Sequence, residues 1–233
     1  MKILAVITAR GGSKSIKNKN LVKFLKKPLI YWTIKEAKKS KLINKLIVST
    51  DSVKIKNTAE KFNTEVPFLR PRSISTDQSK SSAAIIHAIN FYKKKKIHFD
   101  YVMMLEPTSP LRSYFDIDKA IKLIVKNKAK SLVTFTKTKS SHPHFLYRIV
   151  KKKIFPYIYK SKYFVTRRQD LKDFYYPDGT IYISEVDYYL KKKNFYHEKT
   201  YPLILPEWKS FEIDSYNDLK IVEAVMRIKN KFY

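Results

Sequence analysis

Residues 2–14 of the chain read KILAVITARGGSK, a short β-branched apolar run that passes directly into a loop containing arginine, two glycines and lysine. An apolar run of this length, rich in Ile and Val, is typical of a strand buried in a parallel sheet. The run is too short to span a membrane and leads into Arg10-Gly11-Gly12 rather than a cleavage site. We therefore interpret it as a strand and not as a signal peptide.

Strands and helices alternate along the chain after this first strand. Apolar runs predict strands at residues 45–50, 65–69, 101–105 and 131–136, and helical periodicity predicts helices at 29–39, 52–62, 81–92 and 115–126. Such alternation indicates a mostly parallel sheet covered by helices on both faces. Right-handed crossovers would bring the loops that follow the strands to one edge of the sheet, where folds of this class bind ligands.

The rhythm changes after residue 137. Residues 142–178 carry prolines and many Tyr and Phe without a helical period, which predicts an insertion of irregular strands and hairpins. The alternating pattern then resumes, with strands expected at 180–183 and 201–205 and helices at 186–192 and 215–229. We predict one domain, 1–233, with 142–178 as the insertion.

Composition restricts the function classes. The 233 residues hold 49 Lys+Arg against 20 Asp+Glu, a formal charge of +29, and only 8 of the basic residues are Arg. Lys is scattered through nearly every segment instead of gathering on one face, so we do not expect nucleic acid as a partner. The absence of Cys excludes disulfides and thiolate sites. No apolar run is long enough for a membrane helix, and we expect a cytoplasmic protein.

The loop after the first strand has the composition of a phosphate site. Only three glycines occur in the chain, and two of them, Gly11 and Gly12, stand here between Arg10 and Ser13-Lys14, with Lys19 and Asn20 following. Backbone amides, a hydroxyl and several cations suit a triphosphate. Neither the P-loop nor the dinucleotide spacing is present. The alternative from these residues alone is a tight turn on a lysine-rich surface.

Arginine and acidic residues mark the same predicted edge of the sheet. Arg10, Arg70 and Arg112 follow the first, third and fourth strands and are candidates for contacts that Lys cannot make, with incidental surface charge as the alternative. Glu212 and Asp214 alternate on an extended segment and so point to one side, which suits Mg²⁺ beside a triphosphate. Asp214 equally suits a helix cap. The tyrosines within 157–163 and 174–189 are interpreted as core and arm packing.

Taken in order, these residues resemble a known family, the acylneuraminate cytidylyltransferases or CMP-sialic acid synthetases. Beyond the opening loop, the resemblance rests on motifs spread over the rest of the chain. They are Ser49-Thr50-Asp51, Leu69-Arg70-Pro71, Pro107-Thr108-Ser109-Pro110-Leu111-Arg112, Arg167-Arg168-Gln169, Asp178-Gly179-Thr180-Ile181-Tyr182-Ile183 and Glu212-Ile213-Asp214. The related Kdo cytidylyltransferases open with a different loop.

The resemblance implies a Rossmann-like nucleotidyltransferase fold and transfer of CMP from CTP to an acidic nine-carbon sugar. It implies that Arg10, Lys19 and Asp214 are catalytic and that Glu212 and Asp214 hold Mg²⁺. It places the nucleotide on Arg10, Gly11, Gly12, Ser13, Lys14, Lys19, Asn20, Arg70 and Ser81, and the sugar on Glu106, Arg168 and Gln169. It also implies a homodimer, with 142–178 as the dimerisation arm.

Four positions depart from the family pattern. Glu212 stands where Asp is usual, Glu106 where Gln is common, Asp178 where Asn is common, and Tyr176 where some sialic-acid enzymes have Arg. The departures change the charge expected near an acidic sugar. They leave the acceptor open among legionaminic, pseudaminic and other nonulosonic acids. Another sugar nucleotidyltransferase of the same fold is one alternative function, and a basic nucleic-acid-binding protein is the alternative from a different class.

Overall fold

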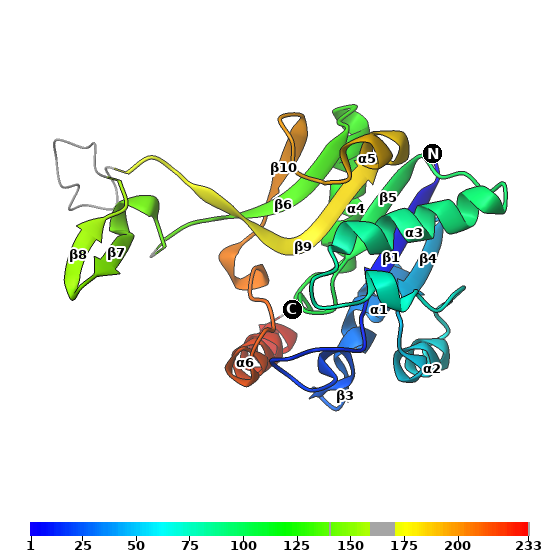
Figure 1. The fold of residues 1–233 in the computed structure, drawn as a ribbon, viewed down its shortest axis with the longest axis horizontal. Coiled ribbons are helices and arrows are strands. Elements are labelled where there is room, and N and C mark those ends of the chain that lie inside the picture. The colour runs from blue at the N-terminus through cyan, green and yellow to red at the C-terminus, as the bar shows by residue number, and fades with distance from the viewer. Residues whose placement is uncertain (140, 159–170, 233) are drawn as a thin grey trace.

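The computed structural model describes residues 1–139, 141–158 and 171–232, and within the last helix it describes side chains up to residue 228. A six-stranded sheet forms the centre, in the order β10-β6-β9-β5-β1-β4. Its strands are β1 (Ile3–Thr8), β4 (Lys45–Ser49), β5 (Tyr101–Leu105), β6 (Ser131–Lys137), β9 (Tyr175–Glu185) and β10 (Thr200–Ile204). The predicted mostly parallel sheet flanked by helices is confirmed (Figure 1).

Helices cover both faces of the sheet, as the alternation along β1 requires. Ile3, Ala5 and Ile7 pack on one side with α1 (Leu29–Lys39), α2 (Val53–Lys61) and α4 (Tyr114–Lys126). Leu4 and Val6 point to the other side, against α3 (Ser81–Lys94) and α5 (Val186–Lys192). Both faces of β1 are therefore buried, which explains why its sequence is apolar without interruption.

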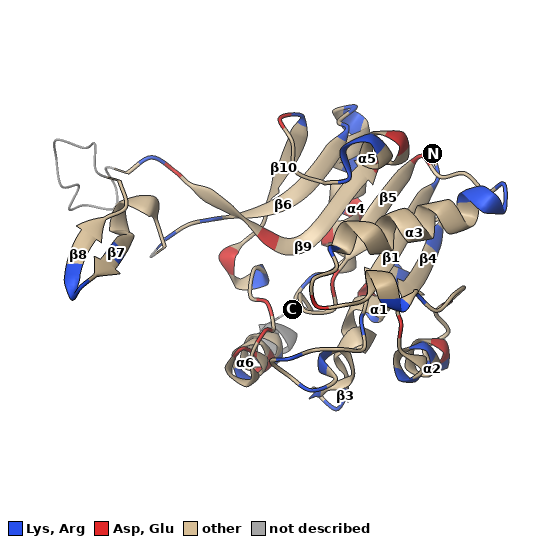
Figure 2. Cartoon of the chain, viewed as in Figure 1, with Lys and Arg blue, Asp and Glu red and all other residues tan. Residues whose placement is uncertain are grey.

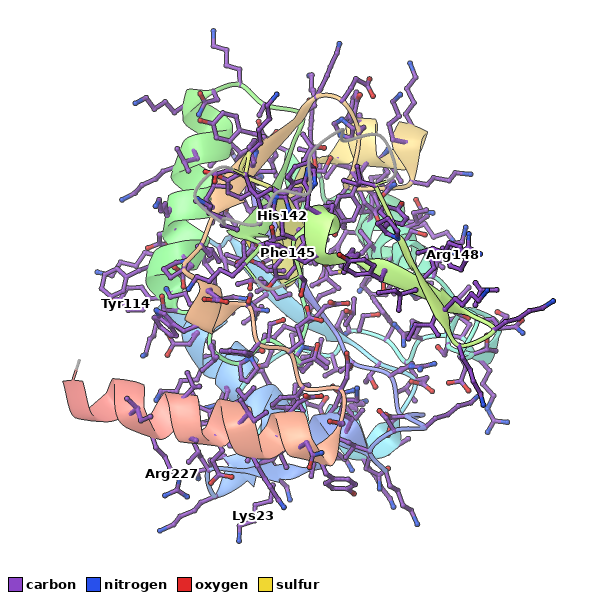
Figure 3. All side chains as sticks on the ribbon, turned by 90° about the vertical axis from the view of Figure 1, so that its left-hand side faces the viewer. Lys23, Tyr114, His142, Phe145, Arg148 and Arg227 are labelled. Carbon is purple, nitrogen blue, oxygen red and sulfur yellow. The ribbon has the colours of Figure 1, made fainter. Side chains whose placement is uncertain are left out.

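A third apolar cluster lies below the sheet and attaches the last helix. Residues of α6 (Tyr216–Phe232), including Val222 and Met226, pack on Ile16, Phe24 and Leu29. These partners come from the loop after β1, from the hairpin of β2 (Lys23–Phe24) and β3 (Lys27–Pro28), and from the first residue of α1. Figure 3 shows α6 crossing the lower part of the molecule, with Arg227 projecting downward from the helix and Lys23 lying below it. The helix thus holds the long loop after β1 in place from its far side.

Two sequence-based expectations about strands are corrected. Residues 65–69 form only two isolated bridges, Ile47 to Glu65 and Thr50 to Leu69, because Pro67 has no N–H to continue a ladder. β9 is longer than the predicted 180–183 and runs antiparallel to both β5 and β6. The reason is that the chain leaves the sheet at the end of β6 and returns at the same edge.

The insertion between β6 and β9 projects from the body as an arm (Figure 1). Its described part contains a short turn of 3₁₀-helix, η3 (Pro143–Phe145), and a hairpin of β7 (Tyr147–Val150) and β8 (Lys153–Pro156). The predicted hairpin is therefore confirmed within residues 142–158. Residues 175–178, which the prediction assigned to the insertion, belong instead to β9 and pair with β6 in the central sheet. Viewed end-on in Figure 3, His142 and Phe145 lie at the base of the arm, where their rings pack edge to face, and Arg148 points outward from β7.

Short 3₁₀ segments complete the described chain: η1 (Lys19–Leu21), η2 (Arg72–Ile74) and η5 (Glu207–Lys209). Figure 2 shows Lys and Arg in helices, loop tips and the arm alike, in keeping with the scatter seen in the sequence. Among the described residues, every helix is too short or too polar to traverse a lipid bilayer.

Candidate active site

Three parallel strands, β4, β1 and β5, end at one edge of the sheet, and the loops after β1 and β5 line a pocket there. β1 pairs in register with β4 and β5, so Thr8 lies beside Ser49 and Ile7 beside Leu105 at the ends of the strands. The pocket has a volume of about 290 Å³. Its walls come from the loop after β1, the segment 70–81 and the loop after β5. The predicted convergence of these loops is confirmed.

The two glycines of the first loop do different things. The Gly11 N–H donates to Oδ1 of Asp51 at 2.8 Å, and a Cβ on Gly11 would lie 2.9 Å from the Cβ of Ser52. Gly11 is therefore small so that the loop can pack on the end of β4. Gly12 has no atom within 4 Å of the place where a Cβ would stand, and it lines the pocket. Its exposed backbone is open to a ligand.

The cations of the loop pair with two carboxylates, Asp77 in the lining of the pocket and Asp214 outside it. Nη1 of Arg10 lies 2.6 Å from Oδ1 of Asp77, and Nζ of Lys14 lies 3.0 Å from the other oxygen of that carboxylate. The hydrogen bond from Lys14, followed by the nearby positive charges, holds the pKa of Asp77 below its ordinary value. Lys19 lies 2.8 Å from Oδ1 of Asp214. Arg10, Lys14 and Lys19 are thus brought to one side of the molecule, as predicted.

The residues predicted around the base and ribose line the same pocket. Asn20 is buried and donates from its side-chain amide to the carbonyl of Arg10 at 2.9 Å, which fixes the loop. Arg70 is buried, donates to Oγ of Ser75 at 2.9 Å and lies 3.8 Å from Asp51. Burial lowers the pKa of Arg70 below its ordinary value. Ser81, the first residue of α3, and Ser13 also face the pocket.

Arg112 differs from the sequence-based expectation. The residue is 2% exposed, does not line the pocket, and burial lowers its pKa to about 10. Its guanidinium donates to the carbonyls of Thr180 at 2.6 Å and Glu106 at 2.9 Å, and to the hydroxyl of Thr33. Arg112 therefore ties the loop after β5 to β9 and α1 instead of offering a ligand contact.

A second pocket of about 600 Å³ adjoins the first. The two share Lys80, Ser81 and Glu106, so Glu106 stands on the boundary between them. Burial raises the pKa of Glu106, and the Arg112 guanidinium opposes that rise. The far wall of the second pocket is aromatic, with Tyr182 and Tyr196. One cationic and one partly aromatic compartment meet at a single carboxylate.

Sequence reasoning missed the aromatic wall. Tyr182 falls in the range interpreted as packing, but its ring lines the second pocket and lies 5.9 Å from the ring of Tyr196, edge to face. Burial, and then the charge of Glu106, raises the pKa of Tyr182. The available signal was the alternation along β9, where Ile181 and Ile183 face one side of the sheet and Tyr182 the other.

Glu212 is held where the third glycine makes room for it. Gly179 has φ +69°, and a Cβ on it would lie only 1.4 Å from Oε1 of Glu212. The Ser109 hydroxyl donates to the same oxygen at 3.5 Å. Burial, with the charges of Glu106 and Asp214, raises the pKa of Glu212 to about 7. A side chain at position 179 would therefore have to displace Glu212.

The carboxylates beside the first pocket have the chemistry of a magnesium site. Among the described residues no group of three or more His, Asp or Glu side chains forms a metal cage. Mg²⁺, however, usually takes one or two protein carboxylates and completes its shell with phosphate oxygens and water. Glu106 and Asp214 both raise the pKa of Glu212, so negative charge gathers beside the pocket, and Lys19, 2.8 Å from Asp214, balances part of it. Glu212 and Asp214 therefore fit the ion.

The remaining predicted residues are placed as follows. Asp178 is buried, lines neither pocket, and accepts hydrogen bonds from Thr134, Thr136 and the backbone of Thr180, so its charge is satisfied within the fold. The Tyr176 hydroxyl lies 2.9 Å from that of Ser210. Arg168 and Gln169, expected at the sugar, lie outside the described residues.

Comparisons with known proteins agree with this geometry. The family profile described as cytidylyltransferase matches residues 4–231. The chain is 29% identical over 231 residues to the pseudaminic acid cytidylyltransferase of Campylobacter jejuni, covering 99% of each chain. It is 33% identical over 244 residues to the CMP-N,N'-diacetyllegionaminic acid synthase of Legionella pneumophila, again covering 99% of each. The solved structure of CMP:2-keto-3-deoxy-manno-octonic acid synthetase complexed with CTP superposes with a TM-score of 0.71 at 15% identity, covering 98% of this chain and 100% of that one.

Proposed function

The chain belongs to the cytidylyltransferase family, and from this we propose that it transfers CMP from CTP to the anomeric hydroxyl of a nonulosonic acid, releasing pyrophosphate. The observation that carries the proposal is the pair of adjoining pockets that meet at Glu106. One is lined by the Gly-rich loop and its cations and suits a nucleotide. The other is larger, partly aromatic and rimmed by Lys, and suits an acidic sugar.

The first pocket would hold CTP. Arg10, Ser13 and Lys19 line the pocket and supply positive charge and a hydroxyl for the triphosphate, and the exposed backbone of Gly12 lets the phosphates approach closely. Lys14 lies outside the lining, beside Asp77 at the rim, and would reach the phosphates from there. The N–H of Gly11 is already engaged by Asp51, so that residue contributes by shaping the loop. Asn20, Arg70 and Ser81 would then surround the cytosine and ribose.

The second pocket would hold the acceptor. The names of two relatives of the chain include pseudaminic acid and N,N'-diacetyllegionaminic acid, both nine-carbon acids of the class that the sequence implies. Tyr182 and Tyr196 offer an apolar wall with hydroxyls, and Lys80, Lys192 and Lys193 offer positive charge for a sugar carboxylate. Arg168 and Gln169 remain proposed sugar contacts. Glu106, between the pockets, would face the reacting end of the sugar.

Little covalent help from the protein is required for this transfer. Arg10 and Lys19 would stabilise charge that builds on the phosphates as the sugar hydroxyl attacks and pyrophosphate leaves. Glu212 and Asp214 would hold Mg²⁺, which when bound supplies further charge neutralisation at the phosphates. The two pockets would align the hydroxyl with the phosphate, so that positioning contributes much of the rate.

The arm suggests how the chain assembles. Ile149 and Ile154 face each other across the β7–β8 hairpin and are 76% and 68% exposed. Large apolar side chains on a projecting hairpin favour burial against another protein. We propose that they pack on a second copy to form a homodimer, and that the enzyme works in the cytoplasm, where CTP is available.

A pyrophosphate-release assay tests the reaction. CTP, Mg²⁺ and a panel of nonulosonic acids are supplied, with ATP, GTP and UTP as controls, and release is expected with CTP and one sugar alone. Arg10→Ala and Lys19→Ala should each lower kcat/KM by about 10²-fold, the effect of losing one preorganised donor. Lys23→Ala, on β2 outside both pockets, is the matched control. Normal kinetics in both site variants would contradict the assignment of the phosphate loop.

A further inference from the structure

Asp77 stands among the cations that the proposed function assigns to the triphosphate. It lies in the loop between η2 and α3 and lines the first pocket. One carboxylate oxygen contacts Nη1 of Arg10 at 2.6 Å and the other contacts Nζ of Lys14 at 3.0 Å. Both oxygens are thus engaged by two of the groups expected to bind phosphate.

The loop around Asp77 is built to present it. Oγ of Ser79 accepts from the backbone N–H of Thr76 at 3.0 Å and lies 2.9 Å from the Thr76 hydroxyl, closing a compact turn. Nη1 of Arg10 also donates to the carbonyl of Thr76 at 3.2 Å. On the other side, Arg70 holds Ser75 at 2.9 Å. Residues 75–77, at the start of the turn, are therefore tethered to two arginines of the nucleotide pocket.

The same cations cannot give their full charge to two anions at once. A triphosphate that binds Arg10 and Lys14 must either break their ion pairs with Asp77 or leave the Asp77 carboxylate close to its own negatively charged oxygens. Breaking the pairs costs free energy and the second arrangement is repulsive, so both oppose binding. The side chains of Arg10, Lys14 and Asp77 are 37%, 84% and 40% exposed. Ion pairs between exposed side chains are weak enough for a ligand to displace. The contact therefore acts as a reversible competitor.

We propose that Asp77 is an internal competitor for the phosphate-binding cations, one that occupies Arg10 and Lys14 in the free enzyme and sets the affinity for the nucleotide. The inference rests on the proposed function, because it requires those cations to bind phosphate. Removing the charge of Asp77 should tighten CTP binding about three- to tenfold, the range expected for weak exposed ion pairs. Cytidine, which has no phosphate, should bind with unchanged affinity.

Calorimetric titration of CTP with Mg²⁺, in the absence of any sugar, tests the proposal on the full chain. Wild type is compared with Asp77→Asn and with Asp187→Asn, which makes the same change of charge at an exposed carboxylate 3.8 Å from Lys93 and away from the first pocket. We expect Asp77→Asn to bind CTP more tightly than the wild type does and to bind cytidine with unchanged affinity. Asp187→Asn should bind both as the wild type does. In a Lys14→Ala background the gain should shrink, since one of the freed cations is missing.

The contrary outcomes separate the inference from the function. If the wild type binds CTP and Asp77→Asn binds it with the same or lower affinity, the inference alone is overturned. Lower affinity would mean that Asp77 orders the cations or helps to hold Mg²⁺. An equal gain in CTP affinity in Asp187→Asn would mean that the effect comes from net charge alone, and this result would also overturn the inference. Absence of CTP binding by the wild type would overturn the proposed function, and the inference with it.

Discussion

At the scale of single residues, the closest constraint in the site is the contact between Gly179 and Glu212. The two residues come from β9 and from the segment before α6, and only the missing side chain of Gly179 lets the carboxylate lie where it does. The position is also in the left-handed region, at φ +69°, which residues other than glycine adopt at a cost. Gly179 thus serves both the backbone turn and the placement of a proposed metal ligand.

Gly179→Ala should therefore harm stability and chemistry together. The left-handed backbone alone should cost about 1–2 kcal/mol of unfolding free energy. The new methyl group must displace Glu212, which should raise the Mg²⁺ concentration needed for half-maximal pyrophosphate release. Chemical denaturation and a Mg²⁺ titration measure the two effects. Gly12→Ala, which enters open space, should leave the unfolding free energy unchanged, and equal stability of the two variants would contradict the argument.

The role of a residue could be predicted from sequence where that residue type is rare in the chain. It could not be predicted where its contact comes from a loop far away in the sequence. The scarcity of glycine drew attention to Gly11 and Gly12, which the sequence already placed in a phosphate loop. Asp77 was not predictable, because it is 67 positions from Arg10 and carries no motif. Arg112 was placed at the correct edge, but burial depends on the packing of α1 and β9, which spacing does not report.

At the scale of elements, an internal ion pair attaches η5 to the start of α4. Nζ of Lys209 lies 2.6 Å from Oδ1 of Asp116, and the two side chains are 12% and 8% exposed. Asp116 also accepts from the backbone N–H and hydroxyl of Ser113, which caps α4. Removal of Lys209 would leave a buried carboxylate without its cation.

Lys209→Met should accordingly lower the unfolding free energy by about 3–5 kcal/mol, the usual result of breaking a buried pair from one side. Lys139→Met is the matched control, because its pair with Glu207 is 63% and 44% exposed and should contribute about 0–1 kcal/mol. Urea unfolding compares the two. A loss below about 1 kcal/mol in Lys209→Met would show that water already screens the pair.

Several elements were predictable from local pattern alone. The predicted bounds of α1, β5 and α5 coincide with those of the structure, because each is a short segment with a strong period or apolar run. Residues 65–69 have the composition of a strand, but Pro67 limits them to two bridges. The direction of β9 was beyond local pattern, since it depends on where the arm returns to the sheet.

At the scale of the whole molecule, the arm projects from the body and exposes large apolar side chains. Exposed Ile149 and Ile154 favour a dimer, and the double change Ile149→Lys with Ile154→Lys should convert it to a monomer by placing charge in the interface. Light scattering coupled to size-exclusion chromatography measures the mass. Ile97→Lys, at a position 43% exposed between α3 and β5, should leave the dimer intact. A wild type that is monomeric at all concentrations would contradict the proposal.

The junction of the arm with the sheet also bears on how such a chain can change over time. The N–H of Thr138 donates to the carbonyl of Phe174 at 2.8 Å, so departing and returning strands are closed against each other before the arm begins. For a loop closed in this way, each doubling of length costs only about 0.6 kcal/mol of closure entropy. Insertions and deletions beyond this clasp therefore leave the register of β6 and β9 untouched. The length of the arm can therefore change among descendants of this chain while the sheet that carries the nucleotide pocket is inherited unaltered.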